Sequence, residues 1–193
     1  MITYKIDEKI YINLTNRCSN NCEFCVRIND SYSDYSLWLK EEPTSAEVIA
    51  ELGDLAGVPE VVFCGYGEPL YRLESIIEIS EYVHKLGKKT RLNSNGQASL
   101  IIGSGVAERL KGKIDTVSIS LNASDATKYQ KICQCEFGEA GFTSLIEFAK
   151  DCKEHIGDVR LSIVDVVGKE EIVRAQALAD SIGVKLKVRE YIA

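Results

Sequence analysis

Short β-rich runs alternate with helical patterns along almost the whole sequence, and this alternation limits the chain to few folds. The runs cover residues 9–15, 60–65, 89–95, 115–122, 159–167 and 184–190. Strands separated by helices in this way predict parallel βαβ units with right-handed crossovers. Because a complete eight-unit barrel takes about 250 residues, six units in 193 residues predict an open, partial (β/α)6 TIM-like barrel. A doubly wound α/β sheet is the competing architecture.

Helical signals lie between these runs. Thr44 and Glu47 form a capping box behind Pro43, which predicts a helix that begins there. Three later segments carry one apolar face at helical spacing. Their apolar residues are Leu73, Ile76, Ile77 and Val83, then Leu145, Phe148 and Ala149, then Ile172, Ala175, Ala179 and Ile182. The last of these helices should end at Gly183.

Side chains alternate between apolar and polar in four of the predicted strands. In the fourth run, Ser118, Ser120 and Asn122 share the face opposite the apolar residues. Parallel strands covered on both faces are nearly continuously apolar, and these are not. We therefore predict that the apolar face packs under the helices, while the polar face lines a wet interior that holds a polar ligand. Exposure of some strands at a sheet edge is the alternative.

Composition limits the class of protein. With 45% hydrophobic residues and no Pro/Gly-rich linker, we expect a single domain over residues 1–193. The opening MITYKIDEKI lacks the apolar region of a signal peptide, and no run approaches the roughly 18 apolar residues that span a bilayer. We expect a cytoplasmic protein without a membrane anchor. The net charge of −6 argues against bulk nucleic-acid binding.

Three cysteines follow the first predicted strand at the spacing CxxxCxxC. They are Cys18, Cys22 and Cys25 in CSNNCEFC, and in a reducing compartment such a group indicates a metal or catalytic site rather than disulfides. A closed zinc or iron–sulfur site has four protein ligands. The loop therefore either borrows a fourth ligand, such as Cys64 or a distant histidine, or leaves one coordination position open.

A second motif, FCGYGEPL, follows the second predicted strand. Gly65 and Gly67 permit a close backbone approach to a ligand, and Glu68 offers a carboxylate to a cation. By itself, GxGEP is also compatible with an ordinary strand-to-helix turn.

Taken together and in this order, the motifs resemble the radical S-adenosylmethionine (SAM) superfamily. The stretches YINLTNRCSNNCEFCVR, GYGEPLYR, LNSNGQ, DTVSISLNASDATKY and VREY are similar to those of the small TatD-family-associated radical SAM proteins. No nuclease activity is implied by that association. The resemblance implies that Cys18, Cys22 and Cys25 hold a 4Fe-4S cluster whose fourth iron binds SAM.

The resemblance also implies a reaction and a set of contacts. Reductive cleavage of SAM would generate a 5'-deoxyadenosyl radical, with reduced flavodoxin or ferredoxin as electron donor, in an oxygen-sensitive enzyme. The residues it assigns to SAM are Phe24, Tyr66, Gly67, Glu68, Asn93, Ser120 and Asn122. Tyr66 departs from the family, in which a glycine is common. The alternatives are a non-catalytic iron–sulfur or zinc module and, among enzymes, a glycyl-radical activating enzyme.

Other residues carry weaker signals. We interpret Cys64, Cys133, Cys135 and Cys152 as buried or incidental thiols. The long 28–43 connection, with Tyr32, Tyr35 and Trp38, is a candidate lid. The residues Arg72, Arg91, Lys187 and Arg189 lie on the predicted interior or next to the GEP turn. They predict an anionic substrate, a small molecule or a modified side chain.

Overall fold

The computed structural model describes residues 1–29 and 36–191, with no description of the side chain of Asn29, and shows one curved, mostly parallel sheet. The strands lie in the sheet in the order of the sequence. They are β1 (Thr3–Ile6), β2 (Lys9–Ile12), β3 (Glu60–Phe63), β4 (Lys89–Ser94), β5 (Thr116–Ser120), β6 (Asp158–Val164) and β7 (Lys185–Arg189). Tyr32 and Tyr35 of the candidate lid lie outside the described residues.

Helices connect the strands. The α-helices are α1 (Val26–Asn29), α2 (Ser45–Leu52), α3 (Leu73–Lys85), α4 (Ala98–Ile101), α5 (Val106–Leu110), α6 (Ala126–Cys133), α7 (Ala140–His155) and α8 (Lys169–Ile182), with 3-10 turns η1 (Pro69–Arg72) and η2 (Asp165–Val167). The capping box is confirmed, because Thr44 accepts from the Glu47 N–H while the Glu47 carboxylate accepts from Thr44 N. None of the described helices is long and apolar enough to cross a membrane.

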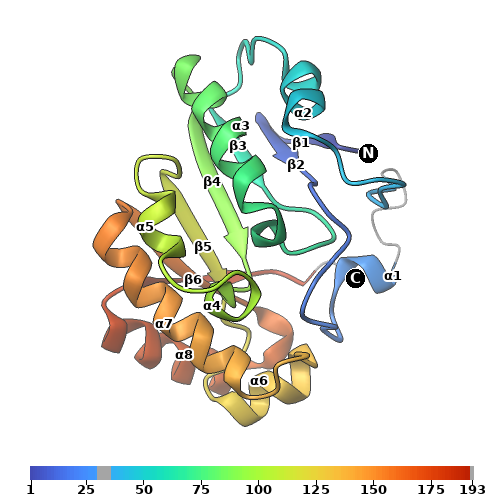
Figure 1. The fold of residues 1–193 in the computed structure, drawn as a ribbon. Helices are drawn as coiled ribbons and strands as arrows, with labels where there is room; N and C mark the ends of the chain where they lie inside the picture. Colours follow the sequence, from blue (N-terminus) through green and yellow to red (C-terminus); the bar gives the residue numbers. More distant parts are fainter. Residues whose placement is uncertain (30–35, 192–193) are drawn as a thin grey trace.

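The strand order decides between the two architectures. In a doubly wound sheet the strand order reverses and helices cover both faces, whereas here each strand from β2 to β7 is parallel to the next one in sequence. Helices α3, α5, α7 and α8 lie along one side of the sheet (Figure 1). The partial-barrel prediction is therefore confirmed, and all six predicted strands are present.

The apolar face of the strands packs under the helices. Ile12, Leu92 and Val117 are fully buried and belong to one core cluster, together with helix residues such as Ile76 and Leu145. Burying these side chains removes apolar surface from water and supplies the main stabilisation of the fold. The opposite face of the sheet is left to polar side chains, as predicted.

Two features differ from the sequence predictions. Strand β1 pairs antiparallel with β2 through a two-residue turn, and that turn, Asp7–Glu8, lacks the Asn-Gly or Asp-Gly signal of a hairpin. Strand β7 is last in the sheet, so no strand covers its outer edge. For this reason Val188 is 46% exposed rather than buried, and the edge-strand alternative is correct for β7.

Candidate functional site

The three motif cysteines lie on the loop that joins β2 to α1, beyond the carboxyl end of β2. Cys18, Cys22 and Cys25 are free, half-buried thiols. Burial raises the pKa of Cys18 to about 12, with smaller contributions from the charges of Glu68 and Cys22. Burial also raises the pKa of Cys25, again with a contribution from Cys22. Cys22 is thus close enough to Cys18 and to Cys25 to influence their ionisation.

One of the three thiols has a partner outside the loop. A hydrogen bond between Cys22 and Cys133, at the end of α6, raises the pKa of Cys22. The backbone N–H groups of Asn21 and Glu23 donate to the carbonyls of Cys133 and Ile132, at 2.9 and 3.1 Å. Cys133 is buried, as predicted for an incidental thiol, but it also docks the cysteine loop on α6.

The thiols do not yet surround one point. In residues 1–29 and 36–191, no three His, Cys, Asp or Glu side chains are grouped so that they could hold a metal ion. The donor set itself suits an iron–sulfur cluster, because three thiolates are soft ligands.

A buried polar network lies beneath the cysteine loop. The Gln97 side chain accepts from Ser19 Oγ at 2.6 Å and donates from Nε2 to Asn20 Oδ1 and to the Tyr129 hydroxyl, both at 2.8 Å. Asn20 Nδ2 also donates to Tyr129 at 2.9 Å, and Asn95 Nδ2 donates to Ser19 Oγ at 2.8 Å. The sequence analysis missed Gln97 and Tyr129. Only the position of Gln97, directly after LNSNG, could have drawn attention to it.

The GEP turn packs directly against the backbone of the cysteine loop. A Cβ added to Gly67 would lie 2.3 Å from the carbonyl oxygen of Thr15 and 2.6 Å from that of Arg17, so only glycine fits. The next N–H group, of Glu68, donates to the Arg17 carbonyl at 2.8 Å. The motif at residues 65–68 and the cysteine loop therefore form one unit.

Glu68 is buried behind this turn. Its carboxylate accepts from Leu70 N at 3.1 Å, from Ser94 Oγ at 2.8 Å and from Asn95 N at 2.6 Å. Burial raises its pKa to about 7, although these hydrogen bonds favour the charged form. Glu68 thus links η1, the end of β4 and, through its charge, Cys18.

Tyr66 is buried, and its ring meets that of Trp38 edge-on, with the ring centroids 5.3 Å apart. The Tyr66 N–H donates to Asn13 Oδ1 at 3.3 Å, while Asn13 Nδ2 donates to the Leu37 carbonyl. The residue that departs from the family pattern therefore anchors the 36–39 segment. Phe24 is half-buried in the loop between Cys22 and Cys25.

The remaining predicted contacts lie at the carboxyl ends of β4 and β5, on the polar face. Asn93 Oδ1 and Asn122 Oδ1 are buried and have no hydrogen-bond partner within the described part of the chain, while Ser120 is half-buried. Leaving a buried polar atom unpaired costs about 1–3 kcal/mol. Asn122 also has a positive φ of 56° and donates from Nδ2 to Cys133 Sγ at 3.7 Å. The two unpaired oxygens are suited to donors of a bound polar ligand.

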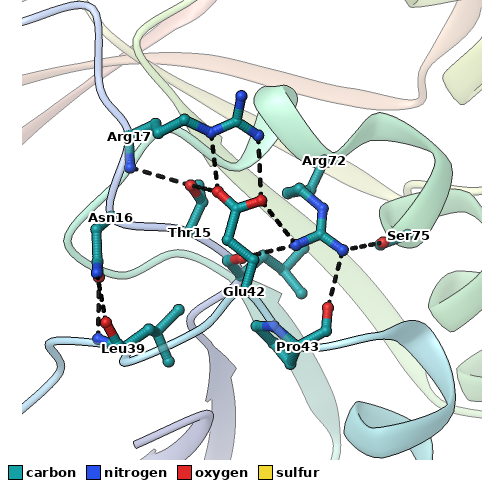
Figure 2. A network of polar contacts seen from close by, with 9 residues as sticks. Thr15, Asn16, Arg17, Leu39, Glu42, Pro43, Arg72 and Ser75 are labelled. Atoms are coloured by element: carbon teal, nitrogen blue, oxygen red, sulfur yellow. Dashed lines mark hydrogen bonds and ion pairs between the residues drawn. The ribbon is translucent and has the colours of Figure 1, made fainter.

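A second polar network fixes the start of the cysteine loop (Figure 2). Glu42 accepts from Thr15 Oγ1, from Arg17 Nε at 2.8 Å and from a terminal nitrogen of Arg72 at 3.1 Å. Asn16 exchanges two hydrogen bonds with the backbone of Leu39. Residues 36–43 of the candidate lid are therefore fastened to the loop.

This network corrects one prediction. The Arg72 guanidinium is bound by Glu42, by the Pro43 and Leu14 carbonyls and by Ser75, so it serves the protein's own chain rather than a substrate anion. Arg91 lies on the polar face of the sheet, as predicted, where it contacts Tyr11 and Glu60.

Comparison with known proteins agrees with these observations. The sequence model described as the Radical SAM superfamily matches residues 12–180. The probable GTP 3',8-cyclase of Methanocella arvoryzae is 29% identical over 126 residues, which cover 65% of this chain and 38% of the relative.

Solved structures share the fold. SuiB of Streptococcus suis bound to its precursor peptide SuiA superposes with a TM-score of 0.73 at 21% identity, over 94% of this chain and 38% of SuiB. The FeFe-hydrogenase maturase HydG of Carboxydothermus hydrogenoformans gives a TM-score of 0.68 at 18% identity, over 95% and 44% of the two chains. The chain thus spans less than half the length of these matches.

Proposed function

Because the chain belongs to the radical SAM superfamily, a superfamily of enzymes that use a 4Fe-4S cluster and SAM, we propose that it cleaves SAM reductively and acts on a substrate by hydrogen abstraction. The observation that carries this proposal is the packing of Gly67 against Thr15 and Arg17, which joins the GEP turn to the three-cysteine loop. When bound, the cluster and SAM would supply an electron and the 5'-deoxyadenosyl radical.

Cys18, Cys22 and Cys25 would hold the cluster. Three protein ligands leave one iron without a side chain, which is where SAM would bind. Cys22 must exchange its hydrogen bond with Cys133 for an iron ligand. The network around Gln97 supports Ser19 and Asn20 from below, so it would keep the loop in place during that exchange.

SAM would lie across the carboxyl ends of the strands. The unpaired oxygens of Asn93 and Asn122 are acceptors for its amino and hydroxyl groups, and Ser120 lies on the same face between them. The backbone of Tyr66 and Gly67 and the Glu68 carboxylate would receive the amino group. Phe24, next to Cys25, would border the cluster and shield it from water.

The partners follow from the same chemistry. We expect reduced flavodoxin or ferredoxin as the electron donor, and a reducing cytoplasm as the compartment, because the exposed cluster would be sensitive to oxygen. The substrate is a small molecule or a protein. If it is a protein, the chain would act as a glycyl-radical activating enzyme. A non-catalytic zinc or iron–sulfur module would need a fourth protein ligand beside the three cysteines.

The test is anaerobic reconstitution with iron and sulfide, followed by dithionite and SAM. We expect about four irons per chain and formation of 5'-deoxyadenosine, both lost in Cys22→Ala. Cys152→Ala, which removes a buried cysteine of α7 outside the loop, is the matched control and should retain both. One zinc per chain, bound by four protein ligands and without deoxyadenosine, would overturn the proposal.

A further inference from the structure

Basic side chains gather on the polar face of the sheet, beside and below the residues proposed to bind SAM. Strand register places them there, because Asn93 pairs with Ser118 and Ser118 pairs with Arg160. In the next row Ser120 pairs with Ser162, which pairs with Lys187. Arg91 precedes Asn93 by two residues and therefore shares its face.

The curvature of the sheet makes these side chains converge. Burial lowers the pKa of Lys187, and the positive charges of Arg91, Arg160, Lys9 and Arg189 lower it further. Lys9 lies on β2 and Arg91 on β4, neither of which is a neighbour of β7 in the sheet. Charges on β2 and β4 therefore act on a side chain of β7, as a curved sheet allows.

The basic cluster, which we define as Lys9, Arg91, Arg160 and Lys187, is paired with two carboxylates among the described residues. The carboxylates paired with it are those of Glu60 and Asp158. Glu60 lies 3.0 Å from Lys9 Nζ and 3.4 Å from a terminal nitrogen of Arg91, and Asp158 contacts Arg160. The concave side therefore carries an excess of positive charge.

Two N–H donors of the basic cluster have no hydrogen-bond acceptor among the described residues. Arg91 Nε and Arg160 Nε are buried atoms without a hydrogen-bond partner, and Arg91 as a whole is only 9% exposed. A guanidinium keeps its charge when buried and needs acceptors for its N–H groups. Both side chains thus keep one N–H group for which residues 1–29 and 36–191 provide no acceptor.

We propose that the basic cluster binds a phosphate group of the substrate. This inference rests on the proposed function and extends it to the class of substrate. Asn93 and Arg91 lie two residues apart on one strand face, roughly 7 Å, so a phosphate held by Arg91, Arg160 and Lys187 leaves the rest of the substrate beside SAM. A phosphate suits the cluster better than one carboxylate, because it carries −1.5 to −2 charges at about pH 7 and offers three acceptor oxygens.

The test measures binding of inorganic pyrophosphate and of citrate to the reconstituted holoenzyme by anaerobic calorimetry, without reductant. We expect pyrophosphate to bind more tightly than citrate, and to bind equally well when SAM is present. Lys187→Ala should weaken pyrophosphate binding about tenfold, as the loss of a charge-assisted contact predicts, and Lys187→Glu should weaken it further. Lys187 is exposed, so these variants should fold.

Lys150→Ala, which removes an exposed lysine of α7, is the matched control and should bind pyrophosphate as the wild type does. Any of three results would overturn the inference. These are binding of pyrophosphate by Lys187→Glu that is as tight as in the wild type, binding of citrate that is tighter than that of pyrophosphate, and complete displacement of pyrophosphate by SAM. Wild-type deoxyadenosine formation is measured separately. A protein that cleaves SAM but binds no pyrophosphate refutes this inference alone, whereas one that cleaves no SAM refutes the proposed function.

Discussion

Gln97 joins the cysteine loop to α6 through its side-chain amide. Its fully buried amide joins Ser19 and Asn20 of the loop to Tyr129 of α6. Each of these three partners would lose a hydrogen bond in a Gln97→Leu variant. A buried polar group left unpaired costs more than an ordinary hydrogen bond gains, because it has also lost its water.

We predict that Gln97→Leu lowers the free energy of unfolding by about 2–3 kcal/mol and reduces the iron retained after reconstitution. Urea unfolding and iron analysis measure the two effects. Gln176→Leu is the control, because Gln176 is exposed on α8, where its side chain donates to Asp180. It should change stability by less than about 0.5 kcal/mol. Equal stability of the two variants would contradict the role given to Gln97.

At the residue scale, motif spacing predicts which residues share a loop, whereas contacts between residues far apart in the sequence cannot be predicted from it. The CxxxCxxC pattern predicts one loop with three thiols, because spacing is a local property of the sequence. Gly67 is predicted to let the backbone approach a ligand, whereas the close approach that the structure shows is to the backbone of the protein's own cysteine loop. The contact of Asn20 with Tyr129 spans 109 residues, and no local pattern marks it. The contact of Cys133 with the cysteine loop could not be predicted for the same reason, since its partner Cys22 lies on another element.

At the scale of elements, Glu171 fastens the start of α8 to the segment after β5. It accepts from Ser124 N at 2.6 Å and pairs with Lys128 at 3.0 Å and with Arg174 at 2.8 Å. Burial opposes its ionisation, but the hydrogen bonds from Ser124, Arg174 and Lys128 outweigh burial and lower its pKa to about 2.

A carboxyl group whose pKa is lower in the folded than in the unfolded protein stabilises the fold above the unfolded value, here 4.5. That contribution is lost as the pH falls from there towards 2. We predict that Glu171→Gln costs roughly 1–2 kcal/mol at about pH 7, a value reduced for its half-exposed partners. Urea unfolding should show this difference shrinking as the pH is lowered to about 3.

The neighbouring Glu170 is 92% exposed, so Glu170→Gln provides the matched control and should show little effect at any pH. A stability difference for Glu171→Gln that stays constant with pH would mean that its ionisation does not hold α8.

Elements with strong local signals were predictable, and elements that depend on pairing were not. The capping box of α2 and the end of α8 at Gly183 each depend on a few adjacent residues. Strand β1 is formed by its pairing with β2, and the exposure of β7 follows from its place at the sheet edge. Neither property can be read from alternation of side chains within one strand.

At the scale of the whole molecule, one curved sheet separates an apolar side from a polar one. Helices cover the apolar side (Figure 1), which leaves the concave side for ligands. The unpaired oxygens of Asn93 and Asn122 lie towards the carboxyl ends of the strands. Arg160 of the basic cluster lies in the same row as Asn93, Lys187 lies in the row of Ser120, and Arg91 lies one row below Asn93. The sequence predicts this division, because polar residues recur on one face in four of the strands. The effect of a charge on β2 on a side chain of β7 depends on the curvature of the sheet, which the pattern within one strand does not show.

The central claim is that three cysteines hold a 4Fe-4S cluster whose remaining iron binds SAM. Electron paramagnetic resonance of the reduced, reconstituted protein tests it most directly, with SAM labelled with 15N at the amino group. The account predicts that SAM changes the cluster spectrum and that the label shows electron–nuclear coupling to the cluster. A cluster spectrum that SAM leaves unchanged, with no coupling to the label, would contradict it.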